Sequence, residues 1–525
     1  MSFTTIGFCI FLLCLLLGYF TVFRRFQWQF LLLASFAFYA FSGWENLVYI
    51  AITIVSTWLA GQHMSKLRTA QKAYFEQNPD LSKPDKKAYK AAANKKLKRW
   101  LIACLLFNFT ILAVVKYANF AIANLNAVSA AFDAPLITPI DLLLPMGISF
   151  YIFQSMGYII DVYRGGESES NLFRLGLFVS FFPQLIQGPI SRFGDLKQTL
   201  FTPHKFDGNR FQTGLARMMW GFFKKLIVAD RLFAAVAVLS RSPEEYAGIY
   251  VLWNALFYAI TLYADFTGGI DITIGAAHML GIDVKENFNR PFYAVNIADY
   301  WRRWHISMGT WFKDYVFYPV SASQPMLKLF KWSKKHLGDG FGKRVSVYVS
   351  TMILWFATGI WHGAEWHFIV WGLVNGIVII LSEECSPLYA RFHARFPVGK
   401  TAWYRAFQIV RTFWLMSFIR IFDVYANVRT TFKMWLSVLT DFGWARFLAD
   451  GFTSLGLAAA DYAVIGISVL VMILVGYAQY NRKVLFLSMR PAVRGVLLAA
   501  MAMAVVVFGI YGFGYDSRQF IYNQF

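Results

Sequence analysis

The stretch WLIACLLFNFTILAVVKY, residues 100–117, decides the fold class, because only Asn108, Thr110 and Lys116 interrupt its apolar character. A helix that spans a membrane needs about 20 mostly apolar residues. Similar runs lie at residues 4–22, 28–42, 46–61, 142–160, 214–238, 248–265, 346–361, 366–382, 405–422, 461–479 and 494–513. The sequence therefore predicts an all-α, polytopic integral membrane protein with about 11–13 membrane helices.

The composition of the 525-residue chain supports this prediction. Hydrophobic residues make up 58% and charged residues 15%, whereas an average globular domain has about 25% charged residues. A soluble fold of this composition would lack the polar side chains to cover its surface, but a lipid-facing surface does not need them. Aromatic residues reach 19%, which is typical of proteins whose Trp and Tyr collect at membrane interfaces.

Two apolar stretches are unlike simple spanning helices. The stretch 172–190 contains Pro183 and Gly188, and we expect a re-entrant or kinked element that is buried in protein or lines a cavity. Gln187 can satisfy the backbone groups that such a break sets free, so it either lines a tunnel or braces the kink. The Gly-rich stretch 266–281 is predicted to form a similar element.

The formal net charge is +21, and most of the basic residues lie between the apolar runs. The loop 63–99 is rich in Lys and Ala, which favours a pair of surface helices. The positive-inside rule places this loop and the loops 282–345, 383–404 and 480–493 in the cytoplasm, and both termini outside. Because the cations flank membrane segments, we expect membrane lipid rather than nucleic acid as their partner.

Ionisable side chains at membrane depth are costly, so each of them is a candidate functional group. His362 stands in the motif Trp361-His362-Gly363, between two predicted helices. Burial favours the neutral imidazole that a general base requires, although an interfacial histidine in a Trp-rich belt fits the position equally well. His367 follows five residues later, about 140° around a helix, so the two do not form a zinc-binding pair and no metal is expected.

A second cluster alternates aromatic and basic residues between positions 299 and 315. It contains Arg302, Arg303, Trp304 and His305. Cations that hold phosphates and rings that stack on adenine would suit a nucleotide-containing acyl donor. An amphipathic helix at the membrane interface is the alternative interpretation.

Two carboxylates form a third cluster in an apolar, Gly-rich segment. Asp265 and Asp271 both need cationic partners at this depth. Arg302, Arg303 and Lys225 are the candidates, and structural ion pairs are favoured over a catalytic role.

In their order along the chain, these segments resemble the membrane-bound O-acyltransferase (MBOAT) family. Within that family they are most similar to the bacterial branch of alginate O-acetyltransferases, which is related to the D-alanyl transferases. The resemblance lies in PMGISF (145–150), DVYRG (161–165), residues 182–190, GFFKK (221–225), residues 263–271 and 300–315, WHG (361–363) and the ending FIYNQF (520–525). Asn523 departs from the usual Phe of that ending.

The resemblance implies one membrane-embedded domain over residues 1–525 with a two-sided funnel. Its core is expected at 140–380, with the basic cytoplasmic loop at 63–99 and additional membrane helices at 400–525. It implies that His362 is the catalytic histidine and His305 a second functional histidine. The residues expected to line the substrate and donor path are Trp361, Arg302, Arg303, Trp304, Asp265 and Gln187.

The implied reaction transfers an acetyl group from a cytoplasmic thioester, either acetyl-CoA or an acyl carrier, to hydroxyls of an extracytoplasmic polysaccharide such as alginate or cellulose. The resemblance also implies a bacterial inner membrane, a separate periplasmic esterase-like partner and no permanently bound cofactor. Because His305 falls in a cytoplasmic loop and His362 one helix further on, we expect donor and acceptor to approach from opposite faces. The alternatives are D-alanyl or other acyl transfer and, more remotely, a lipid-linked sugar transporter or flippase, or a secretion scaffold.

Overall fold

The computed structural model describes residues 2–480, 486–512 and 515. Regular structure in these residues is entirely helical, as the sequence predicts. The chain divides into two compact units, Met1–Phe211 with Ala276–Val284, and Gln212–Gly275 with Lys285–Phe525. The predicted similarity of the ending 520–525 and the predicted placement of the C-terminus lie outside the described residues.

In the described residues, the first unit contains eight helices, the start of a ninth and the last residues of α11 (Ile249–Met279). They are α1 (Ile6–Phe20), α2 (Gln27–Ala40), α3 (Asn46–Gln77), α4 (Lys83–Ala130), α5 (Ile148–Arg164), α6 (Leu172–Ser180), α7 (Phe182–Leu185), α8 (Phe193–Leu200) and the beginning of α9 (Gly208–Phe222).

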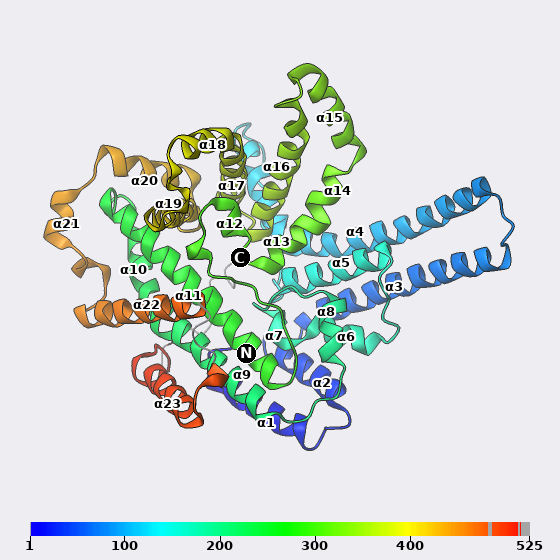
Figure 1. Ribbon diagram of the computed structural model, residues 1–525, viewed down its shortest axis with the longest axis horizontal. Coiled ribbons are helices and arrows are strands. Elements are labelled where there is room, and N and C mark those ends of the chain that lie inside the picture. Colours follow the sequence, from blue (N-terminus) through cyan, green and yellow to red (C-terminus); the bar gives the residue numbers. More distant parts are fainter. Residues whose placement is uncertain (1, 481–485, 513–514, 516–525) are drawn as a thin grey trace. The chain divides into compact units, whose positions relative to one another are not determined.

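Helices α3 and α4 run side by side (Figure 1) and extend through residues 63–99, which we call the basic hairpin. At its tip, Tyr74 stacks on Tyr89 with ring centroids 4.0 Å apart. Ser82 caps α4 by accepting a hydrogen bond from the backbone N–H of Asp85. The predicted surface helix pair is therefore confirmed, and a stacked and capped tip joins its two helices.

The stretch 172–190 is broken, as the sequence predicts. Helix α6 ends at Ser180, a single turn forms α7, and no helix follows until Phe193. The broken segment is buried, and the side chain of Gln184 donates a hydrogen bond to Ser191 Oγ. A Cβ at Gly188 would collide with the backbone of Gln184, so the chain can fold back here only without a side chain.

The second unit contains the other helical elements that the structure describes. These are the rest of α9, the π-helix η1 (Phe223–Ala229), α10 (Asp230–Arg241), α11 (Ile249–Met279, whose last residues belong to the first unit), η2 (Pro291–Tyr293), α12 (Ile297–Trp301), α13 (Ile306–Phe312), the π-helix η3 (Lys313–Phe317), α14 (Tyr318–Ser321), α15 (Gln324–Leu337), α16 (Gly342–His362), α17 (Trp366–Glu384), α18 (Ser386–Arg395), η4 (Pro397–Lys400), α19 (Ala402–Arg420), η5 (Ile421–Asp423), α20 (Val428–Thr440), α21 (Trp444–Asp450), η6 (Thr453–Leu455), α22 (Ala459–Tyr480), η7 (Phe486–Ser488) and α23 (Pro491–Phe508).

The predicted re-entrant element at 266–281 is wrong, because α11 runs unbroken to Met279. Its glycines serve close helix packing instead. A Cβ at Gly268 would lie 2.9 Å from the carbonyl oxygen of Gly221, and one at Gly275 would lie 2.6 Å from that of Gly214. Small residues of this kind let membrane helices approach backbone to backbone.

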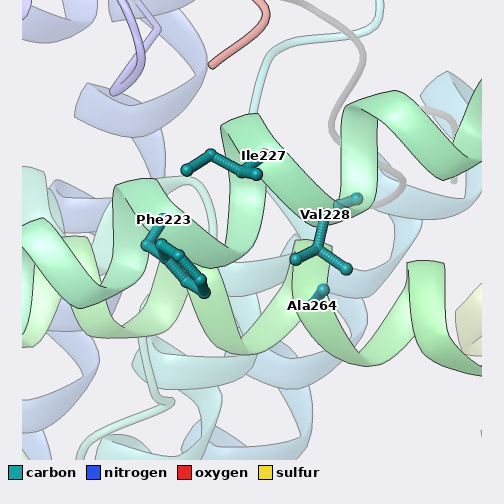
Figure 2. Packing of buried hydrophobic residues seen from close by; sticks show 5 residues of the cluster. Phe223, Ile227, Val228 and Ala264 are labelled. Atoms are coloured by element: carbon teal, nitrogen blue, oxygen red, sulfur yellow. The ribbon is translucent and has the colours of Figure 1, made fainter. Parts of the chain in front are cut away.

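The same seam continues as an apolar contact between η1 and α11. Figure 2 shows Phe223, Ile227 and Val228 of η1 beside Ala264 of α11. All four side chains are buried. The wider turn of a π-helix changes the direction in which successive side chains point, and such turns are frequent at functional sites.

Seven helices of the described chain are long and apolar enough to cross a membrane: α3, α4, α11, α16, α17, α22 and α23. Helix α1 is apolar but shorter, with 15 residues. The other predicted spans form helices that are shorter or less apolar than these seven. The polytopic, all-helical class is therefore confirmed, while the count of about 11–13 membrane helices and the two-sided funnel stay predictions.

Candidate active site

A tight hairpin of α16 and α17 holds His362 in place. His362 is the last residue of α16, and the backbone at Gly363 is extended before α17 begins at Trp366. A Cβ at Gly363 would collide with the ring of Phe368, and one at Gly359 would lie 2.5 Å from the Phe368 carbonyl oxygen. Glycine at both positions is therefore needed for the helices to meet directly at the histidine.

Aromatic rings surround the imidazole of His362, which is 5% exposed. The ring centroid of Trp371 lies 4.6 Å away in an edge-to-face arrangement, and that of Trp361 lies 5.0 Å away. Phe368 stacks at 6.5 Å. Such walls exclude water from the imidazole.

His305 lies between α12 and α13 and is fully buried. Its backbone is left-handed, with φ 47° and ψ 54°, which is uncommon for residues other than glycine and clusters at functional sites. Nδ1 lies 3.1–3.2 Å from the side-chain amide of Asn287. Asn287 Oδ1 in turn accepts hydrogen bonds from the Ser307 N–H at 3.0 Å and the Ser307 hydroxyl at 2.9 Å. These contacts fix the orientation of the ring.

Burial sets the protonation state of His305. Loss of solvation, with a smaller contribution from the positive charge of Arg420, lowers the pKa of His305 to about 3. The side chain is therefore neutral at physiological pH, so it can exchange protons or hydrogen bonds but does not act as a fixed cation.

The two histidines meet at Trp361. The ring of His305 lies 5.9 Å from that of Trp361, whose other neighbour is His362 at 5.0 Å. The expectation that a helix length separates them is therefore wrong. The segment 282–305 does not stay at the surface throughout, because His305 packs edge to face on Phe266 of α11 at 4.9 Å and lies beside Trp361 at the C-terminal end of α16.

The aromatic and basic cluster around His305 does not form one amphipathic helix. Trp304 is buried and stacks on Tyr300 at 5.5 Å. Arg303 pairs with Asp299 at 2.9 Å. Arg302 lies 3.6 Å from the same carboxylate, with 70% of its side chain exposed. The chain instead forms short elements, α12, α13 and η3, that turn between these residues.

The carboxylates of α11 have lysine partners. Lys225 lies 2.5 Å from Asp265 and 2.7 Å from Asp230. Asp271 lies 2.6 Å from Lys224 and 3.0 Å from an arginine of α9, Arg217. The predicted pair of Asp265 with Lys225 is confirmed, whereas the candidates Arg302 and Arg303 are paired elsewhere.

Two further residues that the sequence singled out are Gln187 and His367. Gln187 is buried in the broken segment of the first unit, whereas both candidate histidines belong to the second unit. His367 Nδ1 contacts the carbonyl oxygen of Phe422 at 2.7 Å, and Nε2 lies 2.9 Å from Glu365. In the part of the chain that the structure describes, no group of three or more His, Cys, Asp or Glu side chains could hold a metal ion.

The residues predicted from the sequence do not include Asn287, Trp371, Arg420 and Asp423. Arg420 is 4% exposed and falls inside the apolar run 405–422, so the cost of burying a charge was a usable signal for it. Asn287 stands in a polar stretch between helices and had no such signal. Its role depends on contacts with residues that follow it by about twenty positions.

Comparison with known proteins supplies the class. The model of the MBOAT, membrane-bound O-acyltransferase family matches residues 170–428. The chain is 35% identical over 376 residues to the probable alginate O-acetylase AlgI of Azotobacter vinelandii, covering 70% of each protein. It therefore belongs to the membrane-bound O-acyltransferase family and is an acyltransferase. This class decides against the transporter and scaffold alternatives.

Two further relatives differ in the group or polymer that their names mention. The peptidoglycan O-acetyltransferase of Helicobacter pylori is 29% identical over 356 residues, covering 63% of each chain. The teichoic acid D-alanyltransferase of Bacillus subtilis is 28% identical over 289 residues, covering 53% of this chain and 68% of that one. Both candidate histidines, Asn287 and Arg420 fall inside the family match.

Proposed function

We propose that this protein transfers an acetyl group from a cytoplasmic acyl thioester to hydroxyls of an extracytoplasmic polysaccharide, in the inner membrane of a bacterium. The names of its relatives support acyl transfer to cell-surface polymers. The observation that carries the chemistry is the pair of buried histidines on either side of Trp361. Acetyl-CoA or an acyl carrier would supply the donor, and a periplasmic esterase-like protein would receive or help to deliver the group.

In the proposed step, His362 takes the proton of the attacking hydroxyl. The hydroxyl oxygen bonds to the thioester carbonyl carbon, and the carbon–sulfur bond breaks. The proton then passes to the departing thiolate, so that an ester and a free thiol are the products. His305, neutral and held by Asn287, orients the donor or relays this proton. General base catalysis of this kind contributes about 100- to 10,000-fold in rate.

The test uses purified protein in detergent, labelled acetyl-CoA and alginate oligosaccharides, with peptidoglycan fragments as a second acceptor. We expect His362→Ala to lower transfer at least about 100-fold and His305→Ala to lower it less. His336→Ala is the matched control, because His336 is an exposed histidine on α15. A monodisperse His362→Ala protein with normal turnover would refute the assignment.

D-alanyl transfer is the second candidate, favoured by similarity to the teichoic acid D-alanyltransferase. A comparison of the two acyl donors distinguishes the two reactions. If acetyl-CoA supports no transfer while a D-alanyl thioester does, the acetyl proposal fails and D-alanyl transfer replaces it. Retention of label on the protein itself, rather than on the acceptor, would reveal a covalent acyl-enzyme.

A further inference from the structure

Arg420, at the end of α19, is a buried cation surrounded by tryptophans. Its guanidinium lies 4.8 Å from the ring of Trp371, 5.1 Å from that of Trp304 and 5.4 Å from that of Trp301. We call these three residues the tryptophan cage. Nη1 of Arg420 donates a hydrogen bond of 2.9 Å to Asp423. A cation over an aromatic face is held more strongly when it is removed from water, as Arg420 is here.

The cage leads to both candidate histidines. Trp304 directly precedes His305 in the chain, and Trp371 packs edge to face on His362 at 4.6 Å. Arg420 therefore contacts the immediate neighbour of each histidine. The contacts come from three separate parts of the second unit: the turn after α12, helix α17 and the end of α19.

Packing alone is a poor explanation for a charge at this position. Both side chains of the Arg420–Asp423 pair are nearly buried, with 5% and 4% exposed. Removing two charges from water is costly for each ion, and apolar side chains of similar volume often stabilise a core better. The planar guanidinium can, however, stack on several rings while it donates to a carboxylate, which a lysine or an aliphatic side chain cannot do.

We infer that Arg420 is a positioning residue for acyl transfer. Held by Asp423, it fixes Trp304 and Trp371, and these rings hold the two histidines in their relative orientation. The inference rests on the proposed function, because it assigns Arg420 a role in that reaction. A displacement of about 1 Å at a reacting group is enough to lower a rate about 100-fold, so the effect on kcat is expected to be large even without contact to substrate.

The first test removes both charges together, so that no unpaired ion stays buried. In the double variant Arg420→Met, Asp423→Asn, we expect kcat to fall about 10- to 100-fold while KM for acetyl-CoA changes less than about twofold. The control is Arg411→Met on the same helix, where Arg411 donates to the Val295 carbonyl oxygen and lies outside the cage. Arg420→Lys keeps the charge without the planar group. Its kcat should recover less than half of the difference between the double variant and the wild type.

The second test does not depend on activity. Diethyl pyrocarbonate modifies neutral imidazoles, and peptide mass spectrometry gives the rate at each histidine. We expect the double variant to raise the rates at His305 and His362 at least about fivefold, with exposed His336 unchanged as internal reference. The modification rates report on the surroundings of the imidazole rings, because a loosened tryptophan cage exposes these rings to solvent.

The outcomes separate the possibilities. A monodisperse double variant with normal kcat, or with unchanged modification rates at both histidines, overturns the inference. A loss of folded protein with normal kcat per folded molecule also overturns it, because Arg420 would then be structural only. An active His362→Ala enzyme, in contrast, refutes the proposed function while the modification rates still report on the cage.

Discussion

The basic hairpin and the tryptophan cage place cations in opposite environments. In the hairpin, residues 63–99, most lysines are exposed, and the salt bridge of Lys72 with Glu76 has side-chain exposures of 81% and 66%. In the cage, Arg420 is shielded from water on several sides and shares its charge with one buried carboxylate. Exposed ion pairs contribute little to the free energy of folding, and one such pair can replace another. A buried charge depends on a specific partner, and the loss of that partner is strongly destabilising.

Breaking the buried pair is expected to have the largest effect on stability. Arg420→Met alone leaves Asp423 buried without its partner and should cost about 3–5 kcal/mol of folding free energy. The double variant with Asp423→Asn should recover most of this loss. Thermal unfolding in detergent, compared at equal protein concentration, measures both. Equal melting temperatures for the single variant and the wild type would show that the buried pair contributes no more to stability than the exposed charges of the hairpin.

The buried environment of His305 can be tested by lowering the pH. Its pKa is lowered to about 3 in the folded protein, so the unfolded chain binds a proton at higher pH than the folded one does. Stability should therefore be fully present above pH of about 6.5 and fall as the pH drops towards 3. His305→Gln should flatten this slope. An unchanged pH dependence of the melting temperature in that variant would contradict the assignment.

Loss of the hairpin tip should have a moderate, local effect. Tyr89→Ala removes the stack on Tyr74 and the contact with Phe75, which should cost about 0.5–1.5 kcal/mol. We expect faster proteolysis near residues 78–82 and unchanged acyl transfer. A loss of transfer in a well-folded Tyr89→Ala protein would show that the tip contributes to function.

The smallest effect is expected for single exposed cations of the hairpin. Lys87→Ala removes an exposed lysine and should change stability by less than about 0.5 kcal/mol. Thermal unfolding beside the Arg420 variants provides the measurement. A destabilisation comparable to that of Arg420→Met would mean that the hairpin charges are not simply solvated.

Local pattern was sufficient for the seven long apolar helices and for several elements between them. The Lys- and Ala-rich composition of 63–99 predicted a helix pair, and Pro183 with Gly188 predicted a buried break. The same reasoning failed at Gly268 and Gly275, because a glycine that breaks a helix and one that lets two helices touch look alike in sequence. Only the carbonyl groups of Gly221 and Gly214, more than forty residues away, distinguish the two cases.

For the candidate site, too, some features could be predicted from the sequence and others could not. The ordered motifs led to His362 and His305, and the cost of a buried carboxylate led to the pairing of Asp265 with Lys225. The motifs could not place the two histidines on either side of Trp361, since topology alone suggested opposite ends of a helix. Asn287 was missed because an amide in a polar stretch is ordinary until tertiary structure buries it.

The sequence by itself determined the membrane class, the helical content and the membership of an acyltransferase family, because these depend on composition, apolar run length and the order of short motifs. Only the tertiary structure decided which charges are paired, which glycines are packing contacts and how Arg420 reaches the neighbours of both histidines. The contact of Arg420 with Trp304 joins residues more than one hundred positions apart, and its contact with Trp371 joins residues 49 positions apart. Low dielectric and close packing determine their energies, and neither property can be read from residues adjacent in the chain.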